Sequence, residues 1–294
     1  MNKIGICGAG TMGATMAQIF AEKGYETILW GRTEASLERG RKIIGSDELN
    51  GLAWTTNLED LKDCDIIVES IAENLELKQD FFEKLSKIVS KDTILATNTS
   101  GLSMNRISER VEGKERFLGM HWFNPSNLIP LIEIICSDAT DQTYADAVYE
   151  LAKAIGKKPV ICNKDVPGFI ANRIQYAVLR ECMEIVENGV ASIEDVDNVM
   201  KYGLGFRYAA YGPFEVADFG GLDTFYRISE YLNQDLCDKK TPMKLIQDKF
   251  EQGEYGVKNG KGFYDYSGDK AAKAVEIRDK KYLDVKKCQD QWEE

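Results

Sequence analysis

The glycine pattern near the start of the chain limits its fold more than any other feature. Residues 3–8 predict a short buried strand, and Gly8-Ala9-Gly10-Thr11-Met12-Gly13 matches GxGxxG directly after it. We expect a helix to follow from about Met12 to Lys23 and to end at Gly24. A strand, a glycine loop and a helix in this order begin a dinucleotide-binding unit. The alternative is a glycine-rich turn that binds no ligand.

Each residue of this loop has a physical role if a dinucleotide binds there. Gly8 permits the tight turn, Gly10 lets the backbone approach a pyrophosphate, and Gly13 lets the helix pack on the strand. Thr11 and Met12 begin the helix, whose unpaired N–H groups and positive dipole end favour an anion. We therefore predict that residues 8–13 bind the pyrophosphate of a dinucleotide.

Alternating strand and helix patterns follow over the first half of the chain. Strands are predicted at residues 27–30, 65–69, 93–97, 117–120, 132–135 and 159–162. Helical spacing is present at residues 76–90 and 143–155. This alternation predicts an α/β fold of the Rossmann type, with a parallel, doubly wound sheet.

The pattern changes after about residue 164. We predict helices at 167–188, 213–232 and 242–250, and a helix that begins after an N-cap at Ser192. The charged last stretch, residues 267–294, is expected to be a solvated helix or tail. The chain therefore predicts two domains: a dinucleotide-binding domain at 1–163 and a smaller all-helical domain at 164–294.

Composition excludes several classes of partner and site. The formal net charge is −11, which disfavours nucleic acid because phosphate backbones need a basic surface. No apolar stretch is long enough for a membrane span, and the first strand leaves no room for a signal or transit peptide. The seven cysteines have no CxxC spacing and the chain has one histidine. We therefore expect no metal site, and reduced thiols in a cytoplasm.

The second predicted strand ends at Gly31-Arg32, which bears on the choice of cofactor. A dinucleotide fold normally has an acid about 20 residues after the glycine loop, where it binds the adenosine ribose. Here the nearest acid is Glu34. A small residue followed by arginine can admit and pair a 2′-phosphate, so NADP stays open beside NAD. Arg32 could instead stack on adenine or face water.

The single histidine has a candidate partner in another strand. His121 follows an apolar strand, and Glu133 lies within the next one. A carboxylate in an apolar strand needs a partner, because burying it unpaired is costly. If the two strands are neighbours, Glu133 would orient the imidazole for work as a general base. The alternative is a structural His–Glu hydrogen bond in a core.

Two further polar residues are candidates for ligand contacts. Asn172 lies near the start of the helix predicted at 167–188, on a stripe that is otherwise apolar. A polar amide in such a stripe usually has a partner. Ser100 and Asn98 follow a strand, at the carboxyl edge where doubly wound sheets bind ligands. Plain turn or capping roles are the alternative for these hydroxyls.

With these residues in place, the chain resembles the L-3-hydroxyacyl-CoA dehydrogenases, especially the short bacterial 3-hydroxybutyryl-CoA dehydrogenases. The matching segments follow the family's order and span most of residues 3–266. Besides the glycine loop, they are 69–78, 97–103, 121–125, Asp165-Val166-Pro167-Gly168-Phe169-Ile170-Ala171-Asn172-Arg173, 212–215, 221–223 and 260–264.

The resemblance implies roles for individual residues. His121 would be the general base that takes the hydroxyl proton while hydride leaves for the nicotinamide, and Glu133 would be its partner. Ser100 and Asn172 would hold the substrate oxygen. Further dinucleotide contacts would come from Glu73, Lys78, Asn98, Ser100, Asn124 and Lys258. The resemblance also implies an acyl-CoA substrate and a homodimer through the helical domain.

Two departures from the family pattern concern the cofactor and the substrate. Gly31 stands where the family usually has an aspartate. The connection at residues 31–63 is shorter than the family's helical hairpin, which helps to hold the CoA tail. We therefore expect weaker dependence on CoA than in a relative with the full hairpin, but still a preference for acetoacetyl-CoA over free acetoacetate. The cations placed to meet CoA phosphates, or to form a solvated face, are Arg32, Arg39, Arg41, Lys42 and Lys62.

Three alternatives stay open at this point. The substrate could be a free 3-hydroxy acid. The 3-hydroxyisobutyrate and 6-phosphogluconate dehydrogenases share a similar glycine loop but use a lysine base, where this chain has Asn172-Arg173 and no lysine before Lys201. The third alternative is a non-catalytic nucleotide-binding protein, against which the combination of His121, Glu133, Ser100 and Asn172 argues.

Overall fold

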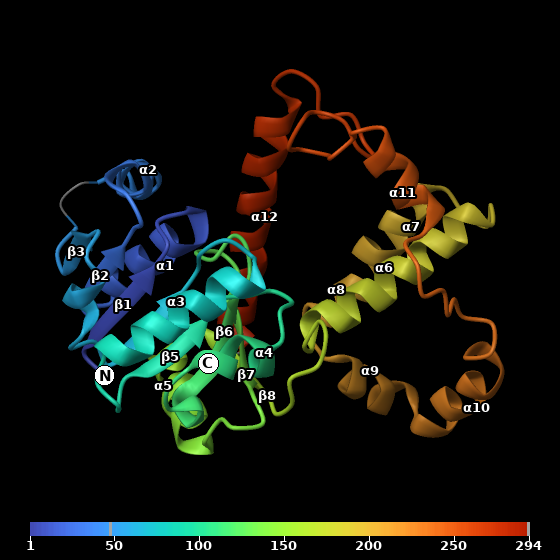
Figure 1. Cartoon of the computed structure of the whole chain (residues 1–294). Helices are drawn as coiled ribbons and strands as arrows, with labels where there is room; N and C mark the ends of the chain where they lie inside the picture. The colour runs from blue at the N-terminus through green and yellow to red at the C-terminus, as the bar shows by residue number, and fades with distance from the viewer. Residues whose placement is uncertain (47–48, 293–294) are drawn as a thin grey trace. The chain divides into compact units, whose positions relative to one another are not determined.

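The computed structural model describes residues 1–46 and 49–292 and divides into two compact units (Figure 1). Unit 1 is Met1–Arg173 and unit 2 is Ile174–Glu294. This division falls after Arg173, whereas the sequence prediction set the domain boundary after residue 163. The intervening segment belongs to unit 1 because the backbone N–H groups of Ile170 and Ala171 donate to Glu133 in the sheet.

Unit 1 is built on one eight-stranded sheet with the order β3-β2-β1-β4-β5-β6-β7-β8. The strands are β1 (Lys3–Cys7), β2 (Glu26–Trp30), β3 (Leu52–Thr55), β4 (Ile66–Glu69), β5 (Ile94–Thr97), β6 (Phe117–Trp122), β7 (Leu131–Cys136) and β8 (Lys158–Cys162). From β3 to β6 every neighbouring pair is parallel. The order is that of a doubly wound Rossmann sheet, so the predicted fold class is confirmed.

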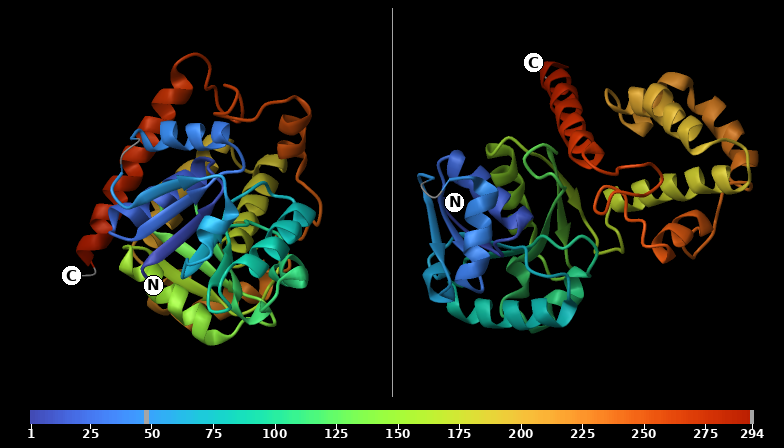
Figure 2. Two further views of the ribbon diagram at one scale, coloured as in Figure 1. Left: turned by 60° about the vertical axis from the view of Figure 1, so that its left-hand side comes forward. Right: turned by 90° about the horizontal axis from the view of Figure 1, so that it is seen from above.

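Helices cover both faces of this sheet, and the two layers can be followed in Figure 2. The helices of unit 1 are α1 (Thr11–Glu22), α2 (Glu34–Ile44), α3 (Leu75–Ile88), α4 (Met104–Ile107) and α5 (Gln142–Ala154). Residues of α1 and α5 share one apolar cluster with the strands, and residues of α3 and α4 share the other. The central strands are apolar throughout because both of their faces are buried.

The sheet is not wholly parallel, and this corrects the sequence prediction. β7 runs antiparallel to β6, and β8 pairs with β7 in parallel. The connection between β6 and β7, residues 123–130, is too short to hold the crossover that a parallel pair requires. The reversal places His121 directly opposite Glu133 in the register of the two strands.

The short edge strand β3 and the single-turn helix α4 are absent from the sequence prediction. β3 has four residues, none of them fully buried, so its sequence shows neither a long apolar run nor a clear alternation. α4 has four residues and begins after Ser103, whose hydroxyl accepts from the Arg106 N–H. Elements of this length give little periodic signal.

Unit 2 is helical, as predicted. Its α-helices are α6 (Ala171–Glu187), α7 (Ile193–Val199), α8 (Gly205–Tyr208), α9 (Pro213–Gly220), α10 (Leu222–Leu232), α11 (Lys244–Glu251) and α12 (Lys270–Trp292). α6 begins three residues before the division between the units. Ser192 caps α7 by accepting from the Asp195 N–H, which confirms the predicted N-cap. Among the residues that the structure describes, no helix is both long and apolar enough to cross a membrane.

Two of the predicted helices in this half, those at 167–188 and 213–232, differ from the observed ones, whereas the C-terminal stretch is as predicted. α6 begins at Ala171 and not at residue 167, because Gly168 and Phe169 have φ angles of 80° and 51°. The run predicted at 213–232 is two helices, because Gly221 between them has φ 87°. The charged C-terminal stretch is helical as α12, with no buried residue in its described length.

Candidate functional site

The glycine loop between β1 and α1 leaves room for a phosphate. Gly8 has φ 117°, and a Cβ there would lie 2.4 Å from the Ser70 carbonyl oxygen. A Cβ at Gly13 would lie 1.8 Å from the Gly8 carbonyl oxygen, so only glycine permits this approach of helix to strand. At Gly10 a Cβ would meet nothing within 4 Å, and no side chain of the described residues caps α1. The first-turn N–H groups, including those of Thr11 and Met12, are open to an anion, so the loop fits a dinucleotide pyrophosphate.

β2 is followed by Gly31, where the family pattern has an acid, and then by the cation Arg32. Gly31 is buried, and a Cβ there would lie 2.6 Å from the side chains of both Ser36 and Leu37. The Ser36 hydroxyl donates to the Thr33 carbonyl oxygen at 2.6 Å and belongs to the N-cap of α2. A larger residue at position 31 would displace this cap. Arg32, which follows Gly31, is exposed.

His121 and Glu133 form a buried pair at the antiparallel step of the sheet. His121 Nδ1 lies 2.9 Å from Glu133 Oε2. His121 is 3% exposed and Glu133 is fully buried. Because Nδ1 is bound to the carboxylate, Nε2 is the ring nitrogen that can exchange a proton with a substrate, and it has no hydrogen-bond partner among the described residues. The contact that the sequence predicted is therefore present.

The second carboxylate oxygen of Glu133 is held by the start of α6. Oε1 accepts from the N–H groups of Ile170 at 3.0 Å and Ala171 at 2.7 Å. Burial raises the pKa of the Glu133 carboxyl, but the hydrogen bonds from His121, Ala171 and Ile170 outweigh it and hold the pKa below its usual value. Glu133 is therefore ionised at neutral pH.

Two aromatic rings lie against the His121 imidazole. The ring centroid of Phe123 is 4.5 Å from that of His121, and the centroid of Phe169 is 5.8 Å away. Phe169 is 1% exposed. The rings give the His121–Glu133 pair an apolar surrounding, in which the interaction of charges is stronger than in water.

Ser100 and Asn172 lie side by side in unit 1. The Asn172 side-chain amide donates to the Ser100 backbone carbonyl at 3.0 Å. Ser100 is exposed, and its N–H donates to Glu73 Oε1 at 3.2 Å. Asn98 Oδ1 accepts from the Trp122 N–H at 2.8 Å, which connects the loop after β5 to the residue that follows His121. The contacts of these residues with a substrate or cofactor stay predictions.

A buried ion pair lies behind Glu73. Lys78 is 1% exposed, and its Nζ lies 2.6 Å from Glu69 Oε1 and 3.5 Å from Glu73 Oε2. Glu69 also accepts from the Thr97 hydroxyl at 2.7 Å. Burial raises the pKa of the Glu69 carboxyl above its usual value, although Lys78 acts in the opposite direction. The ammonium group predicted to contact a dinucleotide is thus bound to two carboxylates of the protein.

Glu69 is a residue that the sequence reasoning missed. It ends the apolar strand β4 and is fully buried. The available signal was a carboxylate within an apolar strand, the same signal that identified Glu133. Applied to every predicted strand, that signal would have found both residues.

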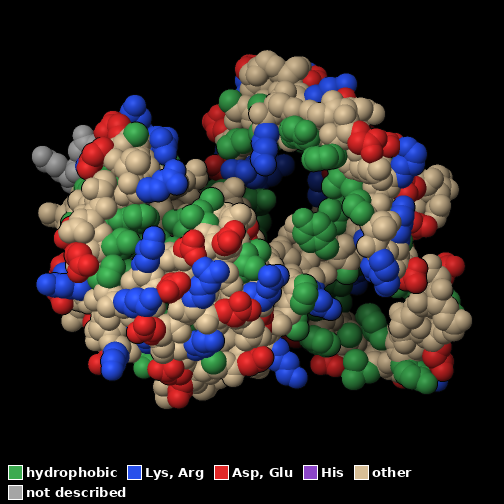
Figure 3. All heavy atoms as spheres, in the orientation of Figure 1, with side chains coloured by type: hydrophobic (Ala, Val, Ile, Leu, Met, Phe, Trp, Pro, Cys, Tyr) green, Lys and Arg blue, Asp and Glu red, His purple; other side chains and the backbone are tan. Residues whose placement is uncertain are grey.

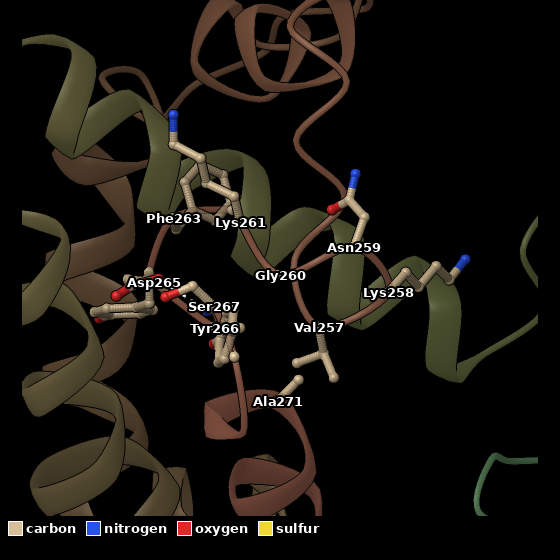
Figure 4. A pocket seen from close by; sticks show the side chains of 13 residues that line it. Val257, Lys258, Asn259, Gly260, Lys261, Phe263, Asp265, Tyr266, Ser267 and Ala271 are labelled. Carbon is tan, nitrogen blue, oxygen red and sulfur yellow. Dashed lines mark hydrogen bonds between the residues drawn. The ribbon is translucent and has the colours of Figure 1, made fainter.

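The last two residues predicted to bind the dinucleotide belong to different units. Asn124 is exposed and follows β6 in unit 1. Lys258 lies in unit 2, between α11 and α12, where residues 257–268 and Ala271 line a pocket of about 800 Å³ (Figure 4). In Figure 4 the Lys258 side chain points away from the centre of this loop. The role of each residue toward a cofactor stays a prediction.

Two family models match the chain in succession. Residues 3–166 match the NAD-binding domain of 3-hydroxyacyl-CoA dehydrogenase, and residues 168–266 match its C-terminal domain. The chain belongs to the 3-hydroxyacyl-CoA dehydrogenase family. It is therefore an oxidoreductase, and its cofactor is NAD.

Relatives of this dehydrogenase include two groups with different names. The 5-formyl-3-hydroxy-2-methylpyridine 4-carboxylate 5-dehydrogenase of Mesorhizobium japonicum is 31% identical, over 98% of each chain. A crystal structure of the enzyme of that activity, described as an NAD⁺-dependent dismutase, has a TM-score of 0.92 at 31% identity and covers 98% of each chain.

The second group carries the names of 3-hydroxybutyryl-CoA dehydrogenases. A probable member from Deinococcus radiodurans is 37% identical, over 90% of this chain and all of its own. The crystal structure of (S)-3-hydroxybutyryl-CoA dehydrogenase from Ralstonia eutropha has a TM-score of 0.75 at 33% identity, and covers 91% of this chain and all of its own.

The two groups differ in how much of this chain they match. The family model ends at residue 266, so α12 lies beyond it. A match that covers 98% of this dehydrogenase has to include most of α12. A match that covers 90% can leave the whole helix out. The pyridine carboxylate dehydrogenase therefore shares the C-terminal helix region.

The connection between β2 and β4 also bears on the substrate. Its described residues, 31–46 and 49–65, contain one α-helix, α2, and the edge strand β3. Arg41 lies 3.6 Å from Glu38 and 4.9 Å from the centroid of the Trp54 ring. Lys42 lies 4.0 Å from Glu38. Two of the cations predicted for CoA phosphates are therefore paired within the connection, although Lys42 is exposed. The other three, Arg32, Arg39 and Lys62, are exposed and have no ion pair among the described residues.

Proposed function

We propose that the enzyme oxidises a hydroxyl group to a carbonyl group with His121 as the general base. One observation carries this proposal: a buried, ionised carboxylate holds Nδ1 of His121, so Nε2 is left for the proton. NAD, held at its pyrophosphate by residues 8–13, would supply the hydride acceptor. A positioned general base of this kind contributes about 10²–10⁴-fold to a rate.

Different residues of unit 1 would then take the proton, stabilise the charge and orient the substrate. The hydroxyl proton would pass to His121 Nε2 while the carbon–hydrogen bond breaks with loss of hydride, so that the carbon–oxygen double bond forms. The resulting imidazolium would be stabilised by Glu133. Ser100 and Asn172 would orient the oxygen. Glu73 would hold the Ser100 backbone through the hydrogen bond between them.

For the substrate, we propose a compact hydroxy acid, or the hydrate of an aldehyde that carries a carboxylate nearby, without CoA. Two observations support a compact substrate. The connection at residues 31–63 has Arg41 and Lys42 paired with Glu38, and the relative that matches 98% of the chain is named for a formyl pyridine carboxylate. An aldehyde hydrate presents the same hydroxyl and carbon–hydrogen bonds as an alcohol, so His121 would serve both.

A short 3-hydroxyacyl-CoA, such as 3-hydroxybutyryl-CoA, is the second candidate substrate. The observation in its favour is the 37% identity to a probable 3-hydroxybutyryl-CoA dehydrogenase, higher than the 31% to the pyridine carboxylate enzyme. Arg32, Arg39 and Lys62 are exposed cations, with no ion pair among the described residues, that could meet phosphates of its CoA.

The two substrate classes are separated by a series of truncated substrates. We would measure kcat/KM with NADH for acetoacetyl-CoA, its pantetheine thioester and free acetoacetate, and with NAD for a formyl pyridine carboxylate. Binding energy from a remote group normally raises kcat/KM for the longer substrate. Values within a few-fold across the three acetoacetyl compounds support the compact substrate. A large preference for acetoacetyl-CoA establishes the second candidate.

We further propose that the enzyme is a homodimer formed through unit 2 and works in the cytoplasm. Four aromatic side chains of unit 2 are strongly exposed: Tyr202 at 78%, Phe206 at 74%, Phe214 at 87% and Phe219 at 72%. Hydrophobic side chains are visible on the face of unit 2 in Figure 3. Large apolar patches typically mark interaction surfaces. The seven cysteines are free, which is typical of a reducing compartment.

A further inference from the structure

Phe169 has a backbone conformation that costs free energy. Its φ is 51°, and it is the one non-glycine residue with positive φ in the described part of the chain. In the left-handed region the Cβ of an L-residue lies too close to the following carbonyl oxygen, and glycine would remove that strain. The phenylalanine side chain must therefore contribute something that outweighs the strain.

Hydrogen bonds on both sides of Phe169 fix this turn. Before it, the Asp165 carboxylate accepts from the Asn105 N–H at 2.9 Å. After it, Glu133 accepts from the Ala171 N–H at 2.7 Å. Strained backbone persists only where the surroundings determine it in this way, and such residues cluster at active sites. The turn is therefore held by the same carboxylate that binds His121.

The ring of Phe169 is buried in an apolar cluster and lies beside the imidazole of His121. It is 1% exposed and shares this cluster with Ile135 and Cys162. Its plane makes an angle of 63° with the imidazole at a centroid distance of 5.8 Å. The hydrogen bond to Glu133 holds the imidazole at Nδ1, and a rotation about the Cβ–Cγ bond of His121 would strain that bond and redirect Nε2. Rings packed against the imidazole restrict this rotation.

We propose that Phe169 is a positioning residue for the general base. Its ring sets the plane of the His121 imidazole, so that Nε2 keeps one direction toward the substrate hydroxyl. Because the backbone of Phe169 is left-handed, a single turn places its ring beside His121 and also places the N–H groups of Ile170 and Ala171 on Glu133. The inference rests on the proposed function of His121. It assigns Phe169 a part in the reaction, the orientation of His121, in addition to its packing in the core.

The test removes the aromatic ring and keeps a side chain with a Cβ at position 169, so the backbone strain at this residue is unchanged. Phe169→Leu retains an apolar side chain on a left-handed residue and removes the aromatic ring. Misplacement of a reacting group can cost up to about 10²-fold in rate, so we expect kcat to fall at least tenfold with an unchanged KM for NAD. The matched control is Phe82→Leu, a fully buried ring of the same cluster, on α3. It should lower the melting temperature without lowering kcat.

A second variant keeps the test decisive if Phe169→Leu does not fold. Phe169→Gly relieves the backbone strain and also removes the ring, so kcat should still fall. A wild-type kcat in either folded variant overturns the positioning role and leaves Phe169 as a packing residue. Failure of the proposed function is recognised separately, because His121→Gln would then retain its turnover whatever the Phe169 variants do.

Discussion

At the scale of single residues, Glu133 connects the parts of the proposed site. One of its oxygens binds His121 on β6, and the other binds the N–H groups of Ile170 and Ala171 at the start of α6. A buried carboxylate with this many donors stays ionised, and its pKa is held below the usual value. Removing its charge should therefore affect both the reaction and the stability of unit 1.

The first prediction concerns catalysis by the Glu133→Gln variant. The amide keeps the shape of the side chain but cannot stabilise an imidazolium by charge. We expect turnover to fall and the acidic limb of the pH profile to move to lower pH, because the protonated form of His121 loses its charged partner. The profile of kcat/KM against pH checks this. An acidic limb that stays in place would mean that Glu133 does not act on His121 electrostatically.

The second prediction concerns stability against pH. Because the pKa of Glu133 is lower in the folded chain than its usual value of about 4.3, its contribution to stability is fully present above that value. It is lost as the pH falls through the folded pKa. The difference in unfolding free energy between wild type and Glu133→Gln should shrink below about pH 4. Urea unfolding at pH 7 and pH 3.5 measures it, and a constant difference would contradict the linkage.

The third prediction concerns the cation beside Gly31. If Arg32 pairs a 2′-phosphate, Arg32→Ala should weaken NADP binding and leave NAD binding unchanged. Titration of both cofactors by isothermal calorimetry provides the measurement, with Arg39→Ala as an exposed control in the same segment. An equal loss for the two cofactors would show that Arg32 contacts a group that both share.

At the scale of the elements, α3 is joined to the sheet through a buried ion pair. Lys78 on α3 bonds to Glu69 on β4. Removing one member of a buried pair leaves an unpaired charge and costs about 3–5 kcal/mol. Lys78→Met should therefore lower the unfolding free energy by that amount, and the charge-free double variant Glu69→Gln/Lys78→Met should lower it less. Urea unfolding of both variants tests this.

The control for this prediction lies on the same helix. Lys87 pairs with Glu83 at 2.9 Å in an exposed position, and exposed pairs contribute about 0–1 kcal/mol. Lys87→Met should therefore change the unfolding free energy little. Equal effects of Lys78→Met and Lys87→Met would show that burial of the first pair does not matter.

The elements also show which parts of the structure the sequence could predict. The glycine loop was predictable because only glycine fits a site where a Cβ would lie 1.8 Å from a backbone oxygen. The pairing of His121 with Glu133 was predictable because an apolar strand cannot hold an isolated carboxylate. Both inferences depend on the residue types and on their neighbours in the sequence, so they need no knowledge of distant contacts.

Other features depend on distant contacts and were not predictable. The reversal of β7 is set by the sheet as a whole, although the short connection before it was a clue. The start of α6 at Ala171 depends on Glu133, which lies far away in sequence and accepts the N–H groups there. The burial of Lys78 follows from its pairing with Glu69, and no periodic pattern marks such a pair.

At the scale of the whole molecule, the exposed aromatic residues of unit 2 bear on assembly. Phe214→Ser and Tyr202→Ser change two of the most exposed rings. We expect the double variant to shift the mass measured by analytical ultracentrifugation from dimer toward monomer, because a symmetric interface loses each contact twice. Leu77→Ser, an exposed apolar residue of unit 1, is the control. A wild-type protein that sediments as a monomer would rule out the dimer.

The central claim, that His121 is the general base of an NAD-dependent oxidation, is tested most directly by His121→Gln. Glutamine can still bond to Glu133, so the fold of unit 1 should be retained. The measurement is kcat for the best substrate of the truncation series, together with the Kd of NAD by calorimetry. We predict that kcat falls by about 10²–10⁴-fold with an unchanged Kd. A kcat near that of the wild type would contradict the account.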